Sequence, residues 1–531
     1  MTPLQVHSYY TFLKGTISPE VLINKASEYK LSSLAITDTN AMHGIVQFVK
    51  HAEEKKIKPI LGTVITDMKD NNNYVILLAK NYSGYRDICK IITARKLNEE
   101  FSLIEIIKNQ QTNLFIISPF IYLAKEVHST NDFFVQLITT VKEKRNNRNR
   151  YEYAKSNKLR IVAANPVYFL NQVDYELHKT VSAIRLNTNI DNLEEVDIVD
   201  EEFYFKNPKE IGSEWKYLPE ALDSTKFISD NCNVELNLNE YKFPKYKLDN
   251  EDTAESLLWK ESFKGLHKRY KSITEKEKGR LKYELSVIRE MNFSNYFLIV
   301  WDIVREANRR GMMIIGRGSA ANSITAYCLG LTQVDPIKHN LYFERFLNKA
   351  RSSPPDFDID FSWKERDEIV KYIFEKYGYE KVAMISTTIT FRARSAFREV
   401  AKAFGFTNEE ISRLSKKIPW TNAKNLPNLS KLFPESKDLN FGREPWKSIV
   451  NIASQIAGFP RHLSIHPGGL VITPTKITDY VALEYAKNKG LGLIITQPDM
   501  YSIEELGLIK IDILSQRSLG VLRDTMESIK D

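Results

Sequence analysis

The chain has 531 residues, 43% of them hydrophobic, and a formal net charge of +8, so it is long enough for several domains of about 150 residues each. Its three cysteines are far apart and odd in number, which argues against a disulfide framework and a cysteine zinc site. No signal peptide or membrane-spanning run is recognisable, so we expect a soluble, cytoplasmic protein, and the basic charge suits an anionic polymer as partner.

Strand and helix signals alternate over residues 1 to about 170. Buried strands are predicted at 34–37, 58–62, 74–78 and 160–165, with helices at 41–56 and from residue 85. This rhythm predicts an α/β fold with a parallel sheet, of which a barrel is one form. In such folds the chemistry gathers where strands end, and these ends hold His7, Asp38, Gly62 to Val64 and Asn165 to Tyr168.

A glycine turn marks the middle of the chain. The apolar run Tyr296 to Trp301 leads into a helix to about Arg310, and a short strand is predicted at 312–315. Gly316-Arg317-Gly318-Ser319 and a helix N-terminus follow. We expect this turn to bind phosphate, with Arg317 adding charge and Ser319 capping the helix. A dinucleotide-binding loop and a tight turn without a ligand are the alternatives.

Acids alternate with apolar residues over Pro355 to Phe361. Read as a strand, this stretch places Asp356, Asp358 and Asp360 on one face. Carboxylates this close repel each other and form a site for a pair of Mg²⁺ ions. The alternative is a solvated edge strand whose charges prevent aggregation. Arg345, eleven positions upstream of Asp356, either reaches a triphosphate or pairs with an acid such as Glu344.

Residues 363–465 are predicted to be helical and basic. Arg392, Arg394 and Arg398 suit contacts with a duplex backbone, although a solvated helix face has the same pattern. His462 and His466 are four positions apart, but Pro467-Gly468-Gly469 favours a turn into a strand at 470–472 over a helical zinc pair. A last strand at 506–514 places Lys510 and Asp512 on its polar face.

Taken in order, these stretches resemble the palm of the bacterial C-family DNA polymerases, the polymerase III alpha subunits, and within them the error-prone, damage-tolerant branch. The motifs are Tyr296 to Asp302, Gly316 to Ser319, Phe343 to Leu347, Pro355 to Phe361, His466 to Gly469, and Lys510 to Asp512. The resemblance implies a multidomain α/β fold. Its expected parts are a PHP-like βα barrel (1–245), a nucleotidyltransferase-type palm (246–390 and 466–531) and a helical thumb inserted in the palm (391–465).

The resemblance also implies roles for single residues. Catalysis and metal binding fall on Asp356, Asp358 and Asp512, with Asp360 in a supporting role. The residues implied to bind the incoming dNTP are Gly318, Ser319, Arg345 and Lys510. The implied cofactor is a pair of Mg²⁺ ions, with Mn²⁺ as a substitute. The implied partners are primer-template DNA, dNTP, a C-terminal polymerase half, a sliding clamp and mutasome-type proteins, with no membrane.

Two departures from the family pattern qualify this expectation. In the N-terminal domain, five of the family's metal-ligand positions hold Gln5, Thr39, Val64, Pro166 and Tyr168, so we expect a retained fold without metal and without proofreading. The chain stops at Asp531, before the family's fingers, so we expect weak or no polymerase activity from it alone. The alternatives are a non-catalytic DNA-binding or scaffold half of a split polymerase and a PHP-type metal phosphoesterase.

Overall fold

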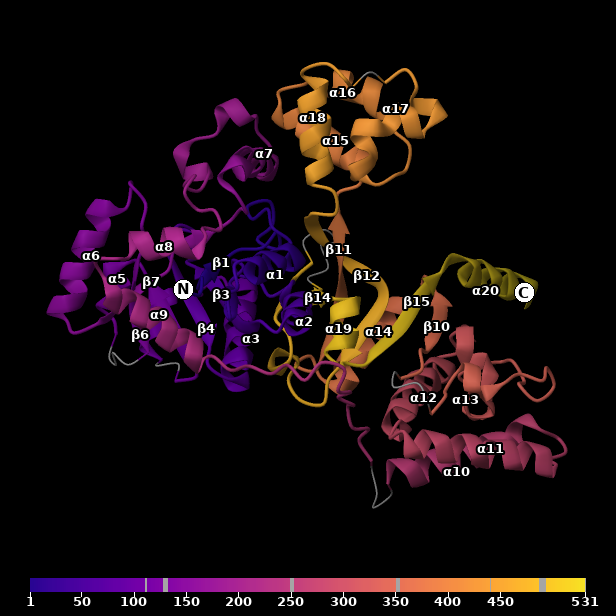
Figure 1. Ribbon diagram of the computed structural model, residues 1–531. Helices are drawn as coiled ribbons and strands as arrows, with labels where there is room; N and C mark the ends of the chain where they lie inside the picture. Colours follow the sequence, from indigo (N-terminus) through magenta and orange to yellow (C-terminus); the bar gives the residue numbers. More distant parts are fainter. Residues whose placement is uncertain are drawn as a thin grey trace. The chain divides into compact units, whose positions relative to one another are not determined.

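The computed structural model describes residues 1–109, 112–127, 132–248, 253–349, 354–439, 441–486 and 493–530. The chain divides into two compact units (Figure 1). Unit 1 comprises residues 1–236, 387–464 and 481–492, and unit 2 comprises residues 237–386, 465–480 and 493–531. Within the described residues, no helix is both long and apolar enough to cross a membrane.

The N-terminal part of unit 1 is built on a six-stranded sheet in the order β2-β3-β4-β5-β6-β7. Its strands are β2 (Ser33–Ile36), β3 (Lys58–Thr66), β4 (Tyr74–Ala79), β5 (Leu114–Ser118), β6 (Phe133–Leu137) and β7 (Arg160–Ala163). Short strands β1 (Gln5–Val6) and β8 (Pro166–Val167) pair in parallel. The helices are α1 (Pro19–Glu28), α2 (Ile45–Lys55), α3 (Tyr82–Leu97), α4 (Leu103–Lys108), α5 (Ile121–Ala124), α6 (Lys144–Ser156), α7 (Tyr175–Leu186), α8 (Pro208–Glu214) and α9 (Pro219–Asn231).

The predicted α/β class is confirmed, but the sheet predicted to be parallel is mixed. Strand β4 runs antiparallel to both of its neighbours, β3 and β5. The turn between β3 and β4 explains the first reversal, because Asp67 donates its amide to the Asn73 carbonyl at 2.9 Å and closes a short connection. A parallel pair would need a crossover of a dozen residues or more.

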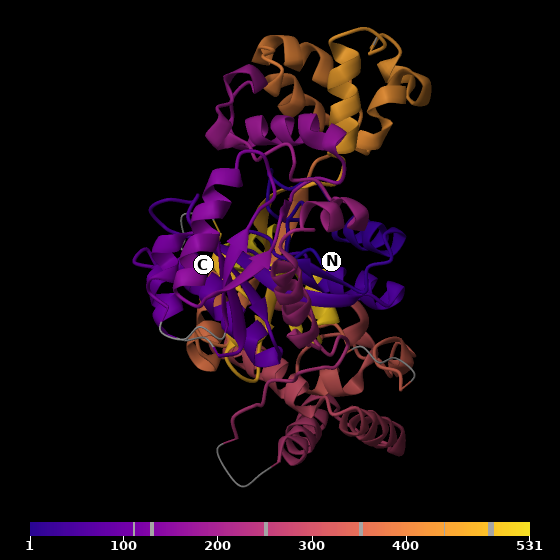
Figure 2. The same cartoon turned by 60° about the vertical axis from the view of Figure 1, so that its left-hand side comes forward.

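A helical module forms the second part of unit 1. It contains α15 (Ala393–Ala403), α16 (Asn408–Ser415), α17 (Leu429–Leu432) and α18 (Trp446–Gln455). Its core includes Phe397, Val400 and Ile449, and it also includes Leu177 and Val181 from α7. Figure 2 shows the magenta helix α7 along the underside of these orange helices. The N-terminal domain therefore supplies part of this module's core.

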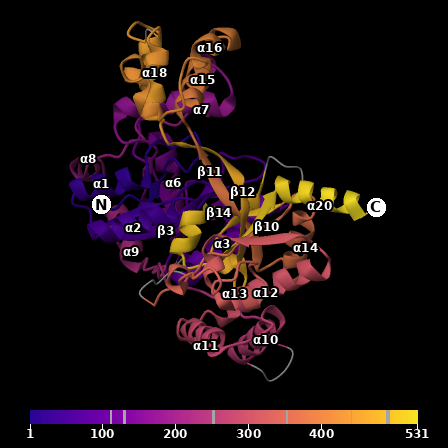
Figure 3. The ribbon, with the colours of Figure 1, turned by 90° about the vertical axis from the view of Figure 1, so that its right-hand side faces the viewer.

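Unit 2 is organised around a sheet that contains the order β14-β11-β12-β15-β10-β9. The strands are β9 (Ile314–Arg317), β10 (Asp358–Ser362), β11 (Val382–Thr390), β12 (Pro460–Ile472), β14 (Ile494–Asp499) and β15 (Lys510–Gln516); β13 (Leu483–Tyr485) lies in unit 1. The helices are α10 (Ala254–Arg269), α11 (Glu275–Glu290), α12 (Ser294–Arg309), α13 (Ile324–Cys328), α14 (Arg366–Tyr377), α19 (Met500–Glu505) and α20 (Arg517–Lys530). Figure 3 shows α14 and α20 beside strands β10 and β15.

Helix α12 fixes the start of the acidic stretch. The apolar run at 296–301 lies inside this helix, not ahead of it as predicted. Phe357 is 2% exposed and its ring packs edge-on against Phe297 and Phe346, with centroids 5.1 and 5.2 Å apart. Asp302 of α12, also buried, accepts hydrogen bonds from Tyr372 and Tyr377 of α14 at 2.8 and 3.0 Å. These contacts hold the residues just before β10 against the core.

Two further predictions of local structure are wrong. Residues 363–465 are not helical throughout, because strand β11 lies within them and β12 begins at Pro460. His466 does not precede a turn, because β12 continues from Pro460 through the glycines to Ile472. Its partner strand β15 explains this, since Gly469, Leu470 and Val471 pair with residues of β15 and keep the chain extended.

Candidate active site

Two acidic strands from distant parts of the sequence are neighbours in unit 2. Strands β10 and β15 run in parallel, and Asp358 is the direct register partner of Asp512 (Figure 1). Neighbouring strands lie about 4.8 Å apart, so the two carboxylates occupy adjacent positions. The alternating residues Ile359 and Ile513 are 1% and 0% exposed, and their burial keeps both acids on the polar face.

Asp512 has one partnered and one unpartnered oxygen. Its Oδ2 lies 3.2 Å from Lys510 Nζ, whereas Oδ1 is buried without a hydrogen-bond partner among the described residues. His466 Nδ1 is 3.8 Å from Oδ1, but this nitrogen accepts the Gly469 amide hydrogen at 2.6 Å and has no proton to give. A buried acceptor without a donor is costly, so Oδ1 is suited to a cation.

The surroundings of Asp358 also disfavour an isolated negative charge. Burial raises the pKa of Asp358 above its ordinary value, and the charges of Asp512 and Asp356 add to that shift, while Arg317 opposes it. Gly318 has a φ of +74°, and a Cβ there would lie 3.3 Å from Asp358 Oδ2. The turn therefore needs glycine both for its backbone conformation and for space beside the carboxylate.

Asp360, the third acid of the stretch, has structural partners. It is 7% exposed, its Oδ1 lies 3.5 Å from Arg317 Nε, and Gln516 Nε2 is also 3.5 Å from this oxygen. Its charge is therefore balanced within the sheet. The alternative of a solvated edge strand is wrong, because β10 has β15 on one side and β9 on the other.

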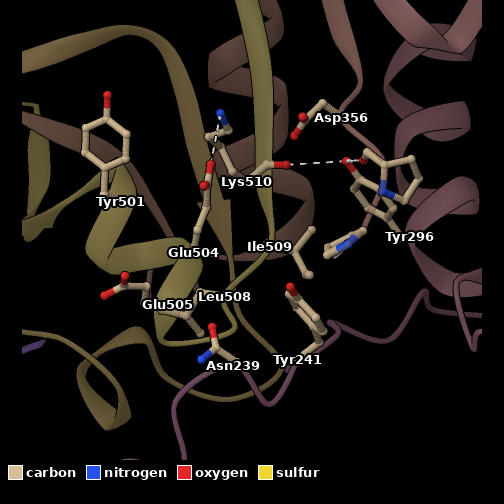
Figure 4. Close-up of a pocket in the computed structure, with 12 residues that line it drawn as sticks. Asn239, Tyr241, Tyr296, Asp356, Tyr501, Glu504, Glu505, Leu508, Ile509 and Lys510 are labelled. Atoms are coloured by element: carbon tan, nitrogen blue, oxygen red, sulfur yellow. Dashed lines mark hydrogen bonds and ion pairs between the residues drawn. The ribbon is translucent and has the colours of Figure 1, made fainter. Parts of the chain in front are cut away.

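Tyr296 ties the segment that carries Asp356 to β15. The buried Tyr296 hydroxyl donates to the Pro355 carbonyl at 3.0 Å and lies 3.4 Å from the Lys510 carbonyl. Asp356 itself is exposed and precedes the strand. Figure 4 shows Asp356 and Lys510 on the wall of a pocket of about 290 Å³, which Glu504 also lines. The predicted acid and the predicted cation thus face one cavity.

Lys510 is held between two carboxylates. Its Nζ lies 3.3 Å from Glu504 and 3.2 Å from Asp512 (Figure 4 draws the contact with Glu504). Burial alone would lower the pKa of Lys510, but Asp512 and Glu504 raise it above its ordinary value. Lys510 is therefore a permanent cation beside Asp512, as contact with a phosphate would require.

The helix N-terminus that follows the predicted phosphate turn is occupied by a protein carboxylate. Glu284 is completely buried and accepts bonds from the Ile324 and Thr325 amides at 3.1 and 3.0 Å. The N-cap is Ser323, not Ser319. Gly318 and Ser319 instead begin the 3-10 turn Gly318–Asn322, beside Asp358.

Arg345 lies in the 3-10 turn Phe343–Arg345 and is exposed. The predicted alternative, an ion pair with Glu344, is not formed: Glu344 accepts the Tyr283 hydroxyl hydrogen at 3.0 Å. In the part of the chain that the structure describes, the Arg345 guanidinium makes no ion pair. It is therefore accessible to a ligand.

The three arginines predicted to contact DNA lie at the start of α15 in unit 1. Arg398 Nη1 donates to Ser412 and Ser415 at 3.1 Å each, and Arg394 Nε donates to the Ile418 carbonyl. These two guanidinium groups thus bind neighbouring segments of their own module. Arg392 and Arg394 are both exposed, whereas Arg398 is half-buried.

The strand ends of the N-terminal domain hold few metal-binding groups. His7 is buried and stacks on Tyr168 with ring centroids 4.0 Å apart, and burial lowers the pKa of His7 well below its ordinary value. Asp38 accepts hydrogen bonds from Ser8 and Thr11 at 2.7–2.8 Å. Gln5, Thr39, Val64 and Tyr168 line a pocket of about 350 Å³ at this place.

Comparisons with known proteins cover nearly the whole chain. Residues 256–515 match the bacterial DNA polymerase III alpha NTPase domain, and residues 3–122 match the PHP domain. An error-prone DNA polymerase from Symbiobacterium thermophilum is 30% identical over 99% of this chain and 52% of its own length. A DNA polymerase III subunit alpha from Halalkalibacterium halodurans is 32% identical over 99% of this chain and 49% of its own length.

The chain belongs to the bacterial DNA polymerase III alpha and error-prone polymerase family. It spans about half the length of the curated relatives that it matches. The matched segments place an N-terminal PHP domain before a polymerase alpha domain, which confirms the predicted order of these two parts.

This polymerase family implies divalent metal ions, so the residues present must be compared with that need. Within the described residues, no three His, Cys, Asp or Glu side chains are grouped as a metal site. The pair Asp358 and Asp512 fits a hard cation in its chemistry, because both offer carboxylate oxygens and Oδ1 of Asp512 lacks a donor. The residues of this polymerase-family chain that would hold the ions are therefore Asp358 and Asp512, with Asp356 on the adjoining segment.

Three residues of the polymerase-like site were not predicted individually. Glu504 lies on the short helix α19, and no sequence pattern points to it. Glu284 looks like any charged residue of a helical segment. Tyr296 sits within an apolar run, and a buried tyrosine usually needs a hydrogen-bond partner; that requirement was the one usable signal.

Proposed function

We propose that this chain is the PHP, palm and thumb portion of a DNA-directed DNA polymerase that transfers nucleotides from dNTP to a primer 3′-hydroxyl. The observation that carries the proposal is the register pairing of Asp358 with Asp512, with an unpartnered buried oxygen on Asp512. Family membership supports it, because the matched region includes both strands. On this proposal residues 246–390 and 466–531 form the palm and residues 391–465 the thumb.

The proposed mechanism assigns one task to each group. Asp356, Asp358 and Asp512 would hold two Mg²⁺ ions, which would lower the pKa of the 3′-hydroxyl and neutralise the leaving pyrophosphate. Lys510 and the exposed Arg345 neutralise the triphosphate of the incoming nucleotide. Gly318 leaves room beside Asp358, and Arg392 contacts the DNA backbone.

A metal titration tests the site itself. We expect the full chain to bind Mn²⁺, monitored by electron paramagnetic resonance, and we expect Asp358→Asn and Asp512→Asn each to weaken binding at least about tenfold. The matched control is Asp367→Asn, because Asp367 is 77% exposed and its nearest cation is Arg366. Equal Mn²⁺ binding by the wild type and both variants would favour a non-catalytic scaffold and end the catalytic proposal.

Primer extension tests the reaction. We expect the full chain to add nucleotides weakly or not at all by itself, and any addition to disappear in Asp512→Asn. Extension that survives in both Asp358→Asn and Asp512→Asn would show that the carboxylate pair is not the catalytic centre. Robust processive synthesis by the wild-type chain would contradict only the expectation of weak activity.

A further inference from the structure

The N-terminal pocket contains two cationic side chains where the family has metal ligands. Its volume is about 350 Å³, and Lys14 and Arg185 line it together with Gln5, Thr39 and Tyr168. Lys14 lies in the segment between β1 and α1, and Arg185 lies in the last turn of α7. Both residues belong to unit 1.

No carboxylate neutralises Lys14. Its Nζ lies 5.5 Å from the centroid of the Tyr168 ring, and among the described residues it has neither a hydrogen bond nor an ion pair. Burial, and then the positive charge of Arg185, lower the pKa of Lys14 to about 8. Lys14 is thus still mainly protonated at pH 7, so the pocket wall carries a cation without an ion-pair partner among the described residues.

Two acids lie near this pocket, but neither forms an ion pair with Lys14 or Arg185 among the described residues. Arg185 Nη2 donates to the Asp197 backbone carbonyl at 2.8 Å, and the charge of Asp197 only opposes the lowering of the Arg185 pKa by burial. Burial raises the pKa of Asp38 to about 6, so Asp38 is mainly ionised at pH 7, and its oxygens are engaged by Ser8 and Thr11. Asp38 does not line the pocket.

The remaining walls suit a small phosphorylated molecule. The Thr39 hydroxyl and the side-chain amides of Asn71 and Asn72 line the pocket and can donate to phosphate oxygens, whereas Thr11, Asn40 and Thr66 donate to neighbouring side chains. Phe12, Tyr74 and Tyr168 add aromatic surface. The volume exceeds that of a phosphate group alone and leaves space for an organic part.

We propose that this pocket binds a phosphomonoester dianion directly, with Lys14 and Arg185 as its charge partners in place of metal ions. Two cations match a dianion in charge, and a guanidinium offers paired donors to phosphate oxygens. This site lies in the other unit from the Asp358 and Asp512 pair. It does not depend on the proposed polymerase function.

Isothermal titration calorimetry of the full chain in EDTA tests the proposal, with inorganic phosphate and deoxyadenosine monophosphate as separate probes. We expect binding that Lys14→Met and Arg185→Gln each weaken at least about tenfold, and that the exposed control Lys209→Met leaves unchanged. Tighter binding of the nucleotide would place its organic part in the pocket. Equal binding would identify the phosphate group alone as the ligand.

Three results would overturn the proposal: no heat with either probe at about 10 mM, the same affinity in both variants as in wild type, or binding only after Mn²⁺ is added. Arg185 is exposed, so Arg185→Gln is expected to fold even if Lys14→Met does not, and a thermal melt of each variant checks this. Asp358→Asn is expected to bind phosphate like the wild type. Failure of this site and failure of the polymerase site are therefore distinguishable.

Discussion

Asp358, which we propose to be a metal ligand, lowers the stability of the ligand-free protein at neutral pH. Burial and the charge of Asp512 raise its pKa, so the folded protein disfavours the ionised form that a cation requires. Stability from this group is present only below its unfolded pKa and is lost as the pH rises through the higher folded pKa. At neutral pH the ionised side chain therefore destabilises the ligand-free protein.

We accordingly expect Asp358→Asn to raise the midpoint of thermal unfolding in EDTA at pH 7.5, by up to about 3 °C, while it removes Mn²⁺ binding. Asp367→Asn is the control for both measurements. The two effects have opposite signs because one substitution removes both the repulsion and the metal ligand. A lower midpoint than wild type would show that the contacts of Asp358 stabilise the fold and would contradict this account.

His178 makes the N-terminal domain sensitive to acid. The ring is completely buried; Nδ1 lies 2.8 Å from the Lys14 carbonyl, and Nε2 accepts the Val199 amide hydrogen at 3.1 Å. Burial lowers the pKa of His178 to about 4. Stability from the neutral ring is complete above the unfolded pKa of 6.5 and is lost as the pH falls toward 4.

We expect acid to destabilise wild type more than His178→Gln. For wild type the loss from this one group between pH 7.5 and pH 5 is about 2 kcal/mol, and urea unfolding followed by circular dichroism at both pH values measures it. His51→Gln is the control, because His51 lies on the solvent side of α2 with its side chain 31% exposed. If His178→Gln and wild type lose the same free energy, His178 does not titrate as inferred.

At the scale of single elements, the short helix α13 depends on Glu284. This carboxylate binds two amide groups of the first turn and the Ser323 hydroxyl, and Arg280 Nε donates to it at 2.8 Å. Its charge is placed at the positive end of the helix and paired with a guanidinium. The turn Gly318–Asn322 immediately precedes this helix.

We expect Glu284→Ala to cost about 3–5 kcal/mol, because it leaves buried amide groups and a cation without partners. The effect on the Gly318 turn should also weaken Mn²⁺ binding at Asp358. Glu277→Ala on the same helix α11 is the control, since Glu277 is only partly buried and its contacts are N-terminal capping bonds with Thr274. A cost below about 1 kcal/mol would mean that water replaces the carboxylate.

Sequence patterns predicted the elements whose cause is local. Alternating polar and buried apolar residues identified β10 and β15, and the helix predicted at 41–56 contains α2. They could not predict strand direction, because β4 is turned by its connections and not by its own residues. They also misplaced the cap at Ser319, since the competing carboxylate comes from Glu284, far away in the sequence.

The candidate site was predictable only where its geometry depends on local sequence. The alternation in β10 showed that Asp358 would lie on a polar face, but the adjacency of Asp512 depended on pairing between remote strands, which only the family resemblance suggested. The contact of Lys510 with Glu504 and the bonds that engage Arg394 and Arg398 within their module had no counterpart in any local pattern.

At the scale of the whole molecule, the N-terminal domain and the helical module share a core. Leu177 and Val181 of α7 are 8% and 0% exposed within the cluster that Phe397 and Ile449 also form. In the sequence, residues 237–386 of unit 2 lie between α7 and the helical module, yet both of these segments belong to unit 1. Cutting the chain between them would uncover apolar side chains.

We therefore expect a fragment of residues 1–236 to bind the dye ANS more strongly than the full chain, because α7 loses its covering helices. The same fragment with Leu177→Ser and Val181→Ser should bind less dye than the unmodified fragment. Fluorescence titration at equal molar concentration provides the comparison. Equal dye binding by the fragment and the full chain would show that α7 closes over its own domain when the module is absent.

The parallel pairing of β10 with β15 has a consequence for biosynthesis. The strand that supplies Asp358 leaves the ribosome well before the strand that supplies Asp512, with the helical module made in between. A nascent polypeptide therefore has only half of the carboxylate pair until translation has passed Gln516. Premature termination within the module would leave a product without Asp512, so on the proposed function such truncated chains would not compete with the finished protein for divalent ions.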